Sequence, residues 1–318
     1  MGKLNFKFVS FLFLISFTVK GTAATDSEKS QAAKKTASTN SLCKAISPFY
    51  WEIGNQSEVL ASGALGSVDR DQVFPVASAS KWFFGAYVVE KLKGSIDPAT
   101  ENYLEMSAGF TSFKIFSCLF SSTVHECLSK GTNSKYTSAH DHKFYYNGGH
   151  FQKWAEEHGM GSMNKDQLTS ELQNQLGSDL KINFTTVQLA GGLKMSAGTY
   201  ALFLRKILSG KLLMKNFLGA HPVCTLPKDC PQAIYSPAPY AWHYSYGHWV
   251  EDDVKTGDGS FSSAGLFGFY PWIDATKTFY GLISRHERPK GGDEGGSGFA
   301  SVQCGRLIRK AYATGVPQ

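Results

Sequence analysis

Apolar segments of different lengths divide the chain into strands near both ends and helices between them. Two short segments, 49–53 and 58–64, flank the polar residues 54–57, and this pattern predicts two strands joined by a turn. A longer apolar segment, 82–93, stops at Gly94 and predicts a helix, because glycine commonly follows a helix C-terminus.

The middle of the chain changes to a loop-rich, helical pattern, and strand character returns afterwards. Further helices are predicted at 151–157, 165–176 and 201–208. Strands are predicted at 246–250, 265–273 and 278–284, before a closing helix at 301–313.

We therefore expect an α+β fold with one sheet that takes its strands from both ends of the chain. Residues 42–95 and 236–318 are expected to form the α/β part. Residues 96–235 are expected to form an inserted, mainly helical lobe.

The first 41 residues differ in composition from the rest. Two lysines precede an apolar stretch, 8–19, and small residues follow it, which is typical of a secretory signal peptide over residues 1–24. The stretch is too short to span a membrane and no cysteine follows it closely, so we expect a secreted or periplasmic protein without a stable membrane anchor. Residues 25–41 contain no large apolar residue and are predicted to form a flexible tether.

The net charge gives no sign of a nucleic-acid partner. The formal charge of the 318 residues is +6, and the three lysines of the signal peptide account for half of it. No cluster of Lys and Arg alternates with aromatic residues, as a nucleic-acid surface would require.

Six cysteines in an exported chain indicate disulfides rather than free thiols. Of the roughly 15 pairings that six cysteines allow, the short spacings favour Cys118–Cys127 and Cys224–Cys230, which leaves Cys43 with Cys304. The C-x-x-C spacing of zinc sites is absent, and His140 and His142 are more typical of polar surface than of a metal site. We expect neither a metal nor a cofactor.

The strongest candidate chemistry is the stretch Ser78-Ala79-Ser80-Lys81 at the start of the predicted helix. Ser78 and Lys81 are three residues apart and so share one face of a helix. The N-terminus of a helix stabilises a developing oxyanion, and a buried lysine can take the proton of a serine hydroxyl. Ser80 is adjacent to Lys81 and would point elsewhere, so Ser78 is the predicted nucleophile. By itself the spacing also fits a capping serine and a surface lysine.

Two later stretches can complete such a site. In Tyr145-Tyr146-Asn147, Tyr145 and Asn147 project to the same side of a tight loop, where one can relay a proton and the other can hold an amide. In Ser263-Ala264-Gly265-Leu266, the glycine lets another backbone or a ligand come close. Alone, the two stretches equally fit an aromatic turn and a core strand with a glycine bend.

In this order and spacing, the three stretches resemble the motifs of the penicillin-recognising serine hydrolases. Residues 78–81 match S-x-x-K, the first motif. Residues 145–147 match the Y-x-N motif of the branch that contains class C β-lactamases, D-Ala-D-Ala carboxypeptidases and family VIII-type esterases. Residues 263–265 occupy the place of the third motif, K-T-G or H-x-G. The resemblance covers about residues 45–315.

This resemblance implies a β-lactamase/transpeptidase-like antiparallel sheet flanked by helices, with the site between the sheet and the helical lobe. It implies an acyl-enzyme on Ser78 whose hydroxyl proton is removed by Lys81 and Tyr145. It also implies substrate contacts at Asn147, Ser263, Gly265 and Leu266, with the N–H groups of Ser78 and Leu266 as the oxyanion hole.

The third motif departs from the family, because Ser263 stands where a Lys or His commonly binds a substrate carboxylate. We therefore expect a small-molecule or peptide-like acyl substrate, with esters or amides favoured. One alternative is a β-lactamase or D-Ala-D-Ala carboxypeptidase in which His248, Arg285 or His286 replaces the missing cation. The other is a non-catalytic binding protein that retains the fold.

Overall fold

The structure is a computed structural model that describes residues 1–2, 24–288 and 296–318. The predicted signal peptide, residues 1–24, falls almost entirely on 3–23, which lie outside the described residues. It stays a prediction.

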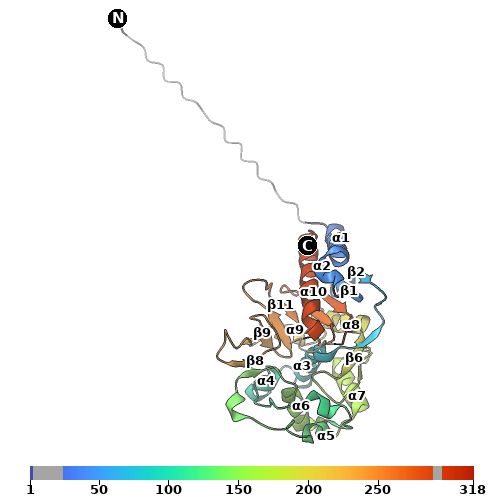
Figure 1. Ribbon diagram of the computed structural model, residues 1–318, viewed down its shortest axis with the longest axis vertical. Helices are drawn as coiled ribbons and strands as arrows, with labels where there is room; N and C mark the ends of the chain where they lie inside the picture. The colour runs from blue at the N-terminus through green and yellow to red at the C-terminus, as the bar shows by residue number, and fades with distance from the viewer. Residues whose placement is uncertain (3–23, 289–295) are drawn as a thin grey trace.

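An eight-stranded antiparallel sheet takes its strands from both ends of the chain, as the sequence predicts (Figure 1). Trp51 lies opposite Gly63 on one side and Ile283 on the other, so an N-terminal strand lies between its own hairpin partner and a C-terminal strand. The strand order is β2 (Val59–Leu65), β1 (Phe49–Gly54), β13 (Tyr280–Ser284), β12 (Tyr270–Ile273), β11 (Ser260–Ser262), β10 (His248–Glu251), β9 (His243–Ser245) and β7 (Val223–Cys224).

The predicted strand 265–273 is shorter in the structure, because residues 265–268 form a turn. The Gly268 N–H donates to the Gly265 carbonyl over 2.9 Å, and β12 begins only at Tyr270. Gly268 has a φ of 103°, which glycine adopts without the steric cost that a side chain would add.

Helices cover both faces of the sheet. Helix α8 (Ala197–Leu208) packs on β13 and β1, and α10 (Gly296–Thr314) packs on β12 and β13. The hydroxyl of Tyr280 accepts a hydrogen bond from an arginine of α8, whereas that of Tyr270 accepts one from an arginine of α10. Tyr280 pairs with Ile273, three positions after Tyr270, so the two tyrosines point to opposite faces.

The helix predicted at 82–93 is confirmed as α3 (Ser80–Lys91), which packs against both α7 (Lys165–Leu176) and β10. A helix that is apolar on all sides is buried on all sides. The side chains of α3 show this, since all of the following are fully buried: Trp82, Phe83, Phe84, Tyr87, Val88 and Val89.

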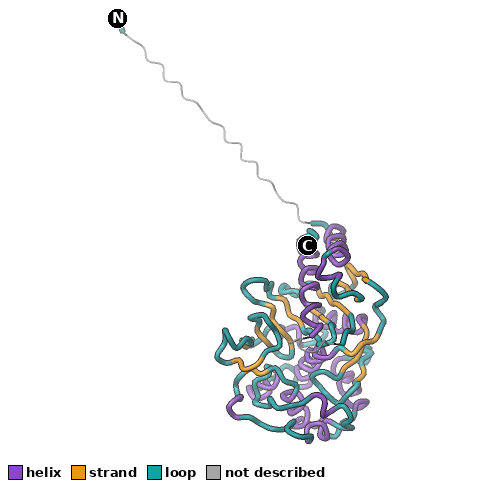
Figure 2. Tube along the Cα trace, viewed as in Figure 1, coloured by secondary structure: helices purple, strands orange, loops and turns teal. Residues whose placement is uncertain are grey.

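The inserted lobe is mainly helical, and Figure 2 shows helices and loops dominating it while most strands lie in the other part. Within the described residues, no helix is long and apolar enough to cross a membrane. Besides α7, the lobe and its borders contain α4 (Pro98–Leu104), α5 (Val124–Ser129), α6 (Gly149–Ala155), α9 (Met214–Phe217) and two small sheets. The first sheet joins β3 (Val73–Pro75), β6 (Leu193–Ser196) and β5 (Asn183–Phe184), and the second joins β4 (Phe144–Tyr145) to β8 (Ala233–Tyr235).

The prediction of a flexible tether over 25–41 is wrong, because α1 (Asp26–Thr39) is a helix packed on α10 and β2 (Figure 1). Thr25 and Glu28 form a capping box that satisfies N–H groups at its start. Its buried face consists of Ala32, Ala33, Thr36 and Ala37. Small side chains let two helices approach closely, so the segment packs without the large apolar residues whose absence suggested disorder. A short helix, α2 (Ser41–Lys44), follows.

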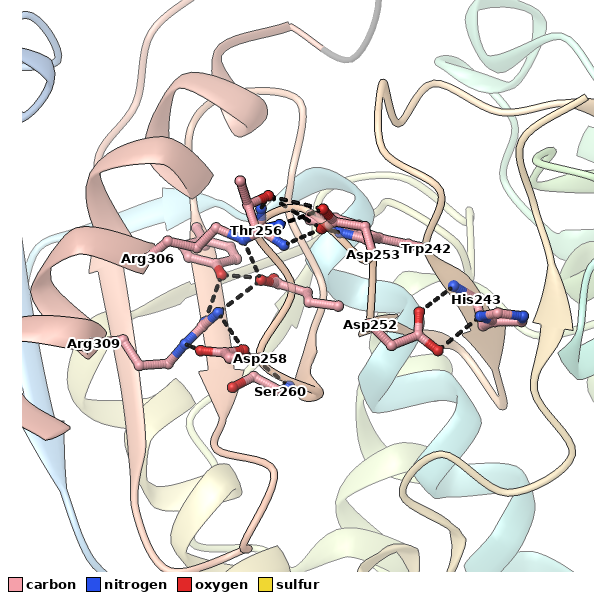
Figure 3. Close-up of polar contacts among 11 residues, drawn as sticks. Trp242, His243, Asp252, Asp253, Thr256, Asp258, Ser260, Arg306 and Arg309 are labelled. Carbon is pink, nitrogen blue, oxygen red and sulfur yellow. Dashed lines mark hydrogen bonds and ion pairs between the residues drawn. The ribbon is translucent and has the colours of Figure 1, made fainter. Parts of the chain in front are cut away.

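Buried ion pairs hold α10 on the sheet (Figure 3). The carboxylate of Glu251, fully buried in β10, accepts from Arg306 over 2.9 Å and from Arg309 over 2.8 Å. Asp253 and Asp258 pair with the same two arginines over 2.9 and 2.6 Å. A buried charge is tolerated when it is paired and hydrogen-bonded in this way.

The three predicted disulfides are confirmed as Cys43–Cys304, Cys118–Cys127 and Cys224–Cys230. The first joins α2 to α10 and so links the two ends of the folded chain. The second closes a loop of the inserted lobe, whereas the third closes the loop that follows β7, the edge strand of the large sheet.

Candidate active site

Ser78 lies in a short 3₁₀ turn, Ala77–Ala79, between β3 and α3. Ala77 has a φ of 45°, a left-handed conformation that is unusual for a residue with a side chain and typical of strained turns at functional sites. Ser78 is partly exposed, whereas Ser80 is buried and its hydroxyl accepts from the Leu193 N–H. Of the two serines, only Ser78 is placed to meet a ligand.

Lys81 is buried in the first turn of α3, with its amine on the Ser78 hydroxyl. The Nζ atom lies 3.0 Å from Ser78 Oγ and 2.8 Å from the carbonyl oxygen of Ala190. Burial lowers the pKa of Lys81 to about 7, because a charged amine loses its hydration there. Near neutral pH a large fraction of the amine is therefore uncharged and able to accept the serine proton.

Tyr146, and not Tyr145, is the tyrosine beside these two side chains. The Lys81 amine lies 4.7 Å from the centre of the Tyr146 ring, and the Tyr146 phenol interacts with the Ser78 side chain. Burial raises the pKa of Tyr146, so its phenol stays protonated at neutral pH. The ring of Tyr145 instead stacks on His140, with 5.5 Å between their centres.

The alternation of side chains along an extended backbone explains why Tyr146, and not Tyr145, points toward Ser78 and Lys81. Tyr145 ends β4 and Tyr146 follows it directly, so their side chains point to opposite sides. The structure therefore brings Tyr146, one residue after the predicted Tyr145, next to Lys81. Attention to this alternation would have made Tyr146 an equal candidate.

Ser263 and Gly265 bring the third stretch against the turn of Ser78. The hydroxyl of Ser263 donates to the carbonyl oxygen of Ser78 over 3.2 Å. Gly265 lies so close to this turn that a Cβ atom there would be 2.2 Å from the Val76 carbonyl oxygen, a distance at which no side chain fits. Within residues 24–288 and 296–318, the backbone N–H groups of Ser78 and Leu266 have no protein acceptor, so both remain available to a ligand.

Solved structures share this architecture. The hydrolase EstCE1, described as having promiscuous acyltransferase activity, aligns with a TM-score of 0.63 at 13% identity, over 91% of this chain and 99% of its own. The D-amino acid amidase of Ochrobactrum anthropi SV3 gives 0.61 at 11% identity, over 91% and 98%. A β-lactamase of Mycobacterium bovis gives 0.55 at 13% identity, over 84% and 96%. The chain has the β-lactamase/transpeptidase-like fold.

At these identities the likeness shows the fold and leaves the activity open. No model of a protein family matches the sequence, and no curated protein does. The three motif stretches nevertheless meet in space at the place where this β-lactamase-like fold joins its sheet to its helical lobe, between α3, β4 and the turn after β11.

Asn147 uses its side chain within its own loop. Its Oδ1 atom accepts from the Gly149 N–H over 2.9 Å, and its Nδ2 donates to the Phe113 carbonyl over 3.3 Å. The side-chain amide of Asn147 thus joins the start of α6 to the backbone at Phe113.

The three residues considered as a replacement cation are occupied elsewhere. His248 is buried between Trp82 and the Gly219 N–H, and burial lowers its pKa to about 3, so it is neutral. The guanidinium of Arg285 is buried against α10 and paired with Glu287. The ring of His286 stacks on Phe74 and lies tilted against Phe267, and burial lowers its pKa. His248 precedes Trp249, which pairs with Ser262, so it lies near Ser263 in the sheet but carries no charge.

Among the described residues, no group of three or more His, Cys, Asp or Glu side chains is arranged to hold a metal ion. The hydroxyl of Thr111 lies 2.8 Å from His140 Nδ1. His142 is exposed and lies near Asp141.

Proposed function

We propose that the protein is an exported serine hydrolase that forms an acyl-enzyme on Ser78. The observation that carries the proposal is the 3.0 Å contact between the Ser78 hydroxyl and a buried lysine whose pKa is about 7. A nucleophile within hydrogen-bond reach of a general base that is partly uncharged at neutral pH is the arrangement that covalent catalysis requires.

In the proposed reaction, Ser78 Oγ attacks the carbonyl carbon of the substrate while its proton passes to Lys81. The negative charge that develops on the carbonyl oxygen is stabilised by the free N–H groups of Ser78 and Leu266. The leaving alkoxide or amine then takes a proton from Lys81, with the Tyr146 phenol as a second donor beside it. Water attacks the acyl-enzyme by the same path and regenerates Ser78.

The preferred substrates are proposed to be esters or amides without a carboxylate. Ser263 carries no charge and its hydroxyl is bonded to the Ser78 backbone, and the three alternative cations are occupied. Among the structural neighbours, one is described as a D-amino acid amidase and another as a hydrolase with promiscuous acyltransferase activity. Three disulfides support the proposed export, because they persist in oxidising compartments.

Covalent labelling with a fluorophosphonate, read by mass spectrometry, tests the proposal. We expect the label on Ser78, none on Ser78→Ala, and normal labelling of Ser80→Ala, the matched control in the same motif. Because the Ser80 hydroxyl accepts a backbone hydrogen bond, that control should be less stable by about 1 kcal/mol while remaining reactive. Absence of labelling in the folded wild type would favour a non-catalytic binding protein.

A further inference from the structure

Large apolar side chains project into solvent from one loop, residues 114–120. The exposed fractions are 56% for Ile115, 83% for Phe116, 45% for Leu119 and 90% for Phe120. Four neighbouring apolar residues this exposed are uncommon on a monomeric protein and indicate a binding surface.

The loop is held in this conformation by covalent and polar contacts. A disulfide joins Cys118 to Cys127 of α5. The Lys114 N–H donates to the side chain of Asn133 over 2.8 Å, and the amide of Asn133 donates to Ser117 Oγ and to the Cys127 carbonyl, each over 2.9 Å. These contacts hold the loop at Lys114, Ser117 and Cys118, in the conformation that exposes its apolar side chains.

The same loop adjoins the wall of the active site. The Gln188 side chain donates to the Ile115 carbonyl over 3.0 Å. Two residues later, the Ala190 carbonyl accepts from Lys81 over 2.8 Å. A surface bound to this loop would therefore lie next to the catalytic centre. In Figure 1, α5, to which Cys118 of the loop is bonded, lies at the end of the molecule opposite α1.

Unpaired positive charge flanks the apolar side chains. Lys114 begins the loop, and Lys135 lies three residues after Thr132, whose hydroxyl donates to the carbonyl of Ser112 just before the loop. Both lysines are exposed, and neither has an acidic partner among the residues that the structure describes. Apolar side chains with adjacent lysines match a membrane surface whose lipids carry negative charge.

The shape of the patch favours lipid over a protein partner. Phe116 and Phe120 stand almost free of their own protein. A protein partner needs a complementary cavity for each projecting ring, whereas the acyl region of a bilayer accepts such side chains without a preformed cavity.

We propose that the loop 114–120 inserts its apolar side chains into an anionic phospholipid bilayer and so presents the active site to acyl substrates held in that bilayer. The docking stands on the loop alone, and the delivery of substrate rests on the proposed hydrolase function.

Co-flotation of the exported protein with vesicles tests the docking without any need for activity. The vesicles contain phosphatidylcholine with an equal amount of phosphatidylglycerol, and Ser78→Ala is used so that no lipid is turned over. We expect Phe116→Ser/Phe120→Ser to weaken binding on the order of tenfold for each ring removed. Val254→Ser is the matched control, because Val254 is fully exposed on another loop and should leave binding unchanged.

Lys114→Gln/Lys135→Gln tests the charge. It should weaken binding about fivefold for each lysine on the anionic vesicles and have little effect on pure phosphatidylcholine. Equal binding of the phenylalanine double variant and its parent would overturn the proposal, as would a parent that does not float with vesicles. A different outcome is a parent that forms a dimer which the phenylalanine double variant does not form, while neither binds vesicles. That result would overturn the proposal and show that the patch joins two copies of the protein.

Measurements of enzyme activity distinguish the docking proposal from the hydrolase proposal. The phenylalanine double variant, with Ser78 intact, should hydrolyse a short water-soluble ester at the wild-type rate and an ester embedded in the vesicles more slowly. If the protein binds vesicles but Ser78 is never labelled, the hydrolase proposal fails and the docking remains. If the protein is labelled and hydrolyses soluble esters but does not bind vesicles, only the docking fails.

Discussion

The hydroxyl of Ser263 donates a hydrogen bond to the backbone carbonyl of Ser78 over 3.2 Å. Ser263 is almost fully buried, and its side chain ties the third motif stretch to the turn that carries the nucleophile. The resemblance to the penicillin-recognising serine hydrolases implies a cation at this position. Here the side chain stabilises the protein's own backbone and leaves the third stretch without a charge for a carboxylate.

The first prediction concerns substrate preference. We expect p-nitrophenyl butyrate to be hydrolysed with a higher kcat/KM than benzylpenicillin, because a charge-assisted hydrogen bond to the carboxylate, about twice as strong as a neutral one, is missing. Steady-state kinetics with both substrates checks this. Ser263→Ala should retain the ratio, since the Ser263 hydroxyl is directed to Ser78. A wild type that prefers benzylpenicillin would show that another cation reaches the substrate.

The second prediction concerns pH. Because burial lowers the pKa of Lys81 to about 7, the amine is protonated and inactive as a base below this pH and uncharged above it. We expect kcat/KM for a neutral ester to rise about tenfold per pH unit below pH 7 and then to level off. Ionisation of Tyr146 should not lower kcat/KM at the alkaline end of this range, because burial raises the pKa of its phenol.

Lys81→Arg is the control for this profile, because arginine stays protonated throughout and should lose roughly a hundredfold or more in acylation rate. A wild-type profile that is flat between pH 5 and 9 (about the range where a buried lysine would titrate) would contradict the role of Lys81 as the base.

The third prediction separates the two tyrosines. Tyr146→Phe should lower the acylation rate roughly a hundredfold, because it removes the phenol beside Ser78 and Lys81. Tyr145→Phe should keep most activity, because its ring stacks on His140 away from the nucleophile. Single-turnover acylation kinetics of the matched pair decides between them, and the reverse result would restore Tyr145 to the proton path.

The fourth prediction concerns stability. Arg309→Met should lower the free energy of unfolding by about 3 to 5 kcal/mol, because it leaves the buried carboxylate of Glu251 with one fewer partner. Urea denaturation followed by circular dichroism measures the change. The double variant Glu251→Leu/Arg309→Met should recover part of the loss, since both buried charges are then removed. Equal stability of Arg309→Met and wild type would mean that this pair contributes little.

The sequence by itself determined the features that depend on local pattern and on covalent spacing. Alternation and apolar runs placed β1, β2, α3 and α7 close to their observed bounds. Four cysteines were paired by their short spacing in the sequence, and the remaining two, Cys43 and Cys304, were paired with each other. All three bonds are confirmed. The order of the motif stretches predicted the fold, and the three-residue spacing of Ser78 and Lys81 predicted their contact, because both depend on the chain's linear order.

Tertiary structure decided what depends on residues far apart in the chain. Residues 26–39 form a helix only because α10 and β2 offer a surface on which alanines pack closely. The choice between Tyr145 and Tyr146 follows from the direction in which β4 enters the site, and the bond of Ser263 to Ser78 spans 185 residues. The lowered pKa of Lys81 arises from burial, which no local pattern specifies, because the surroundings of its amine include segments more than a hundred residues away.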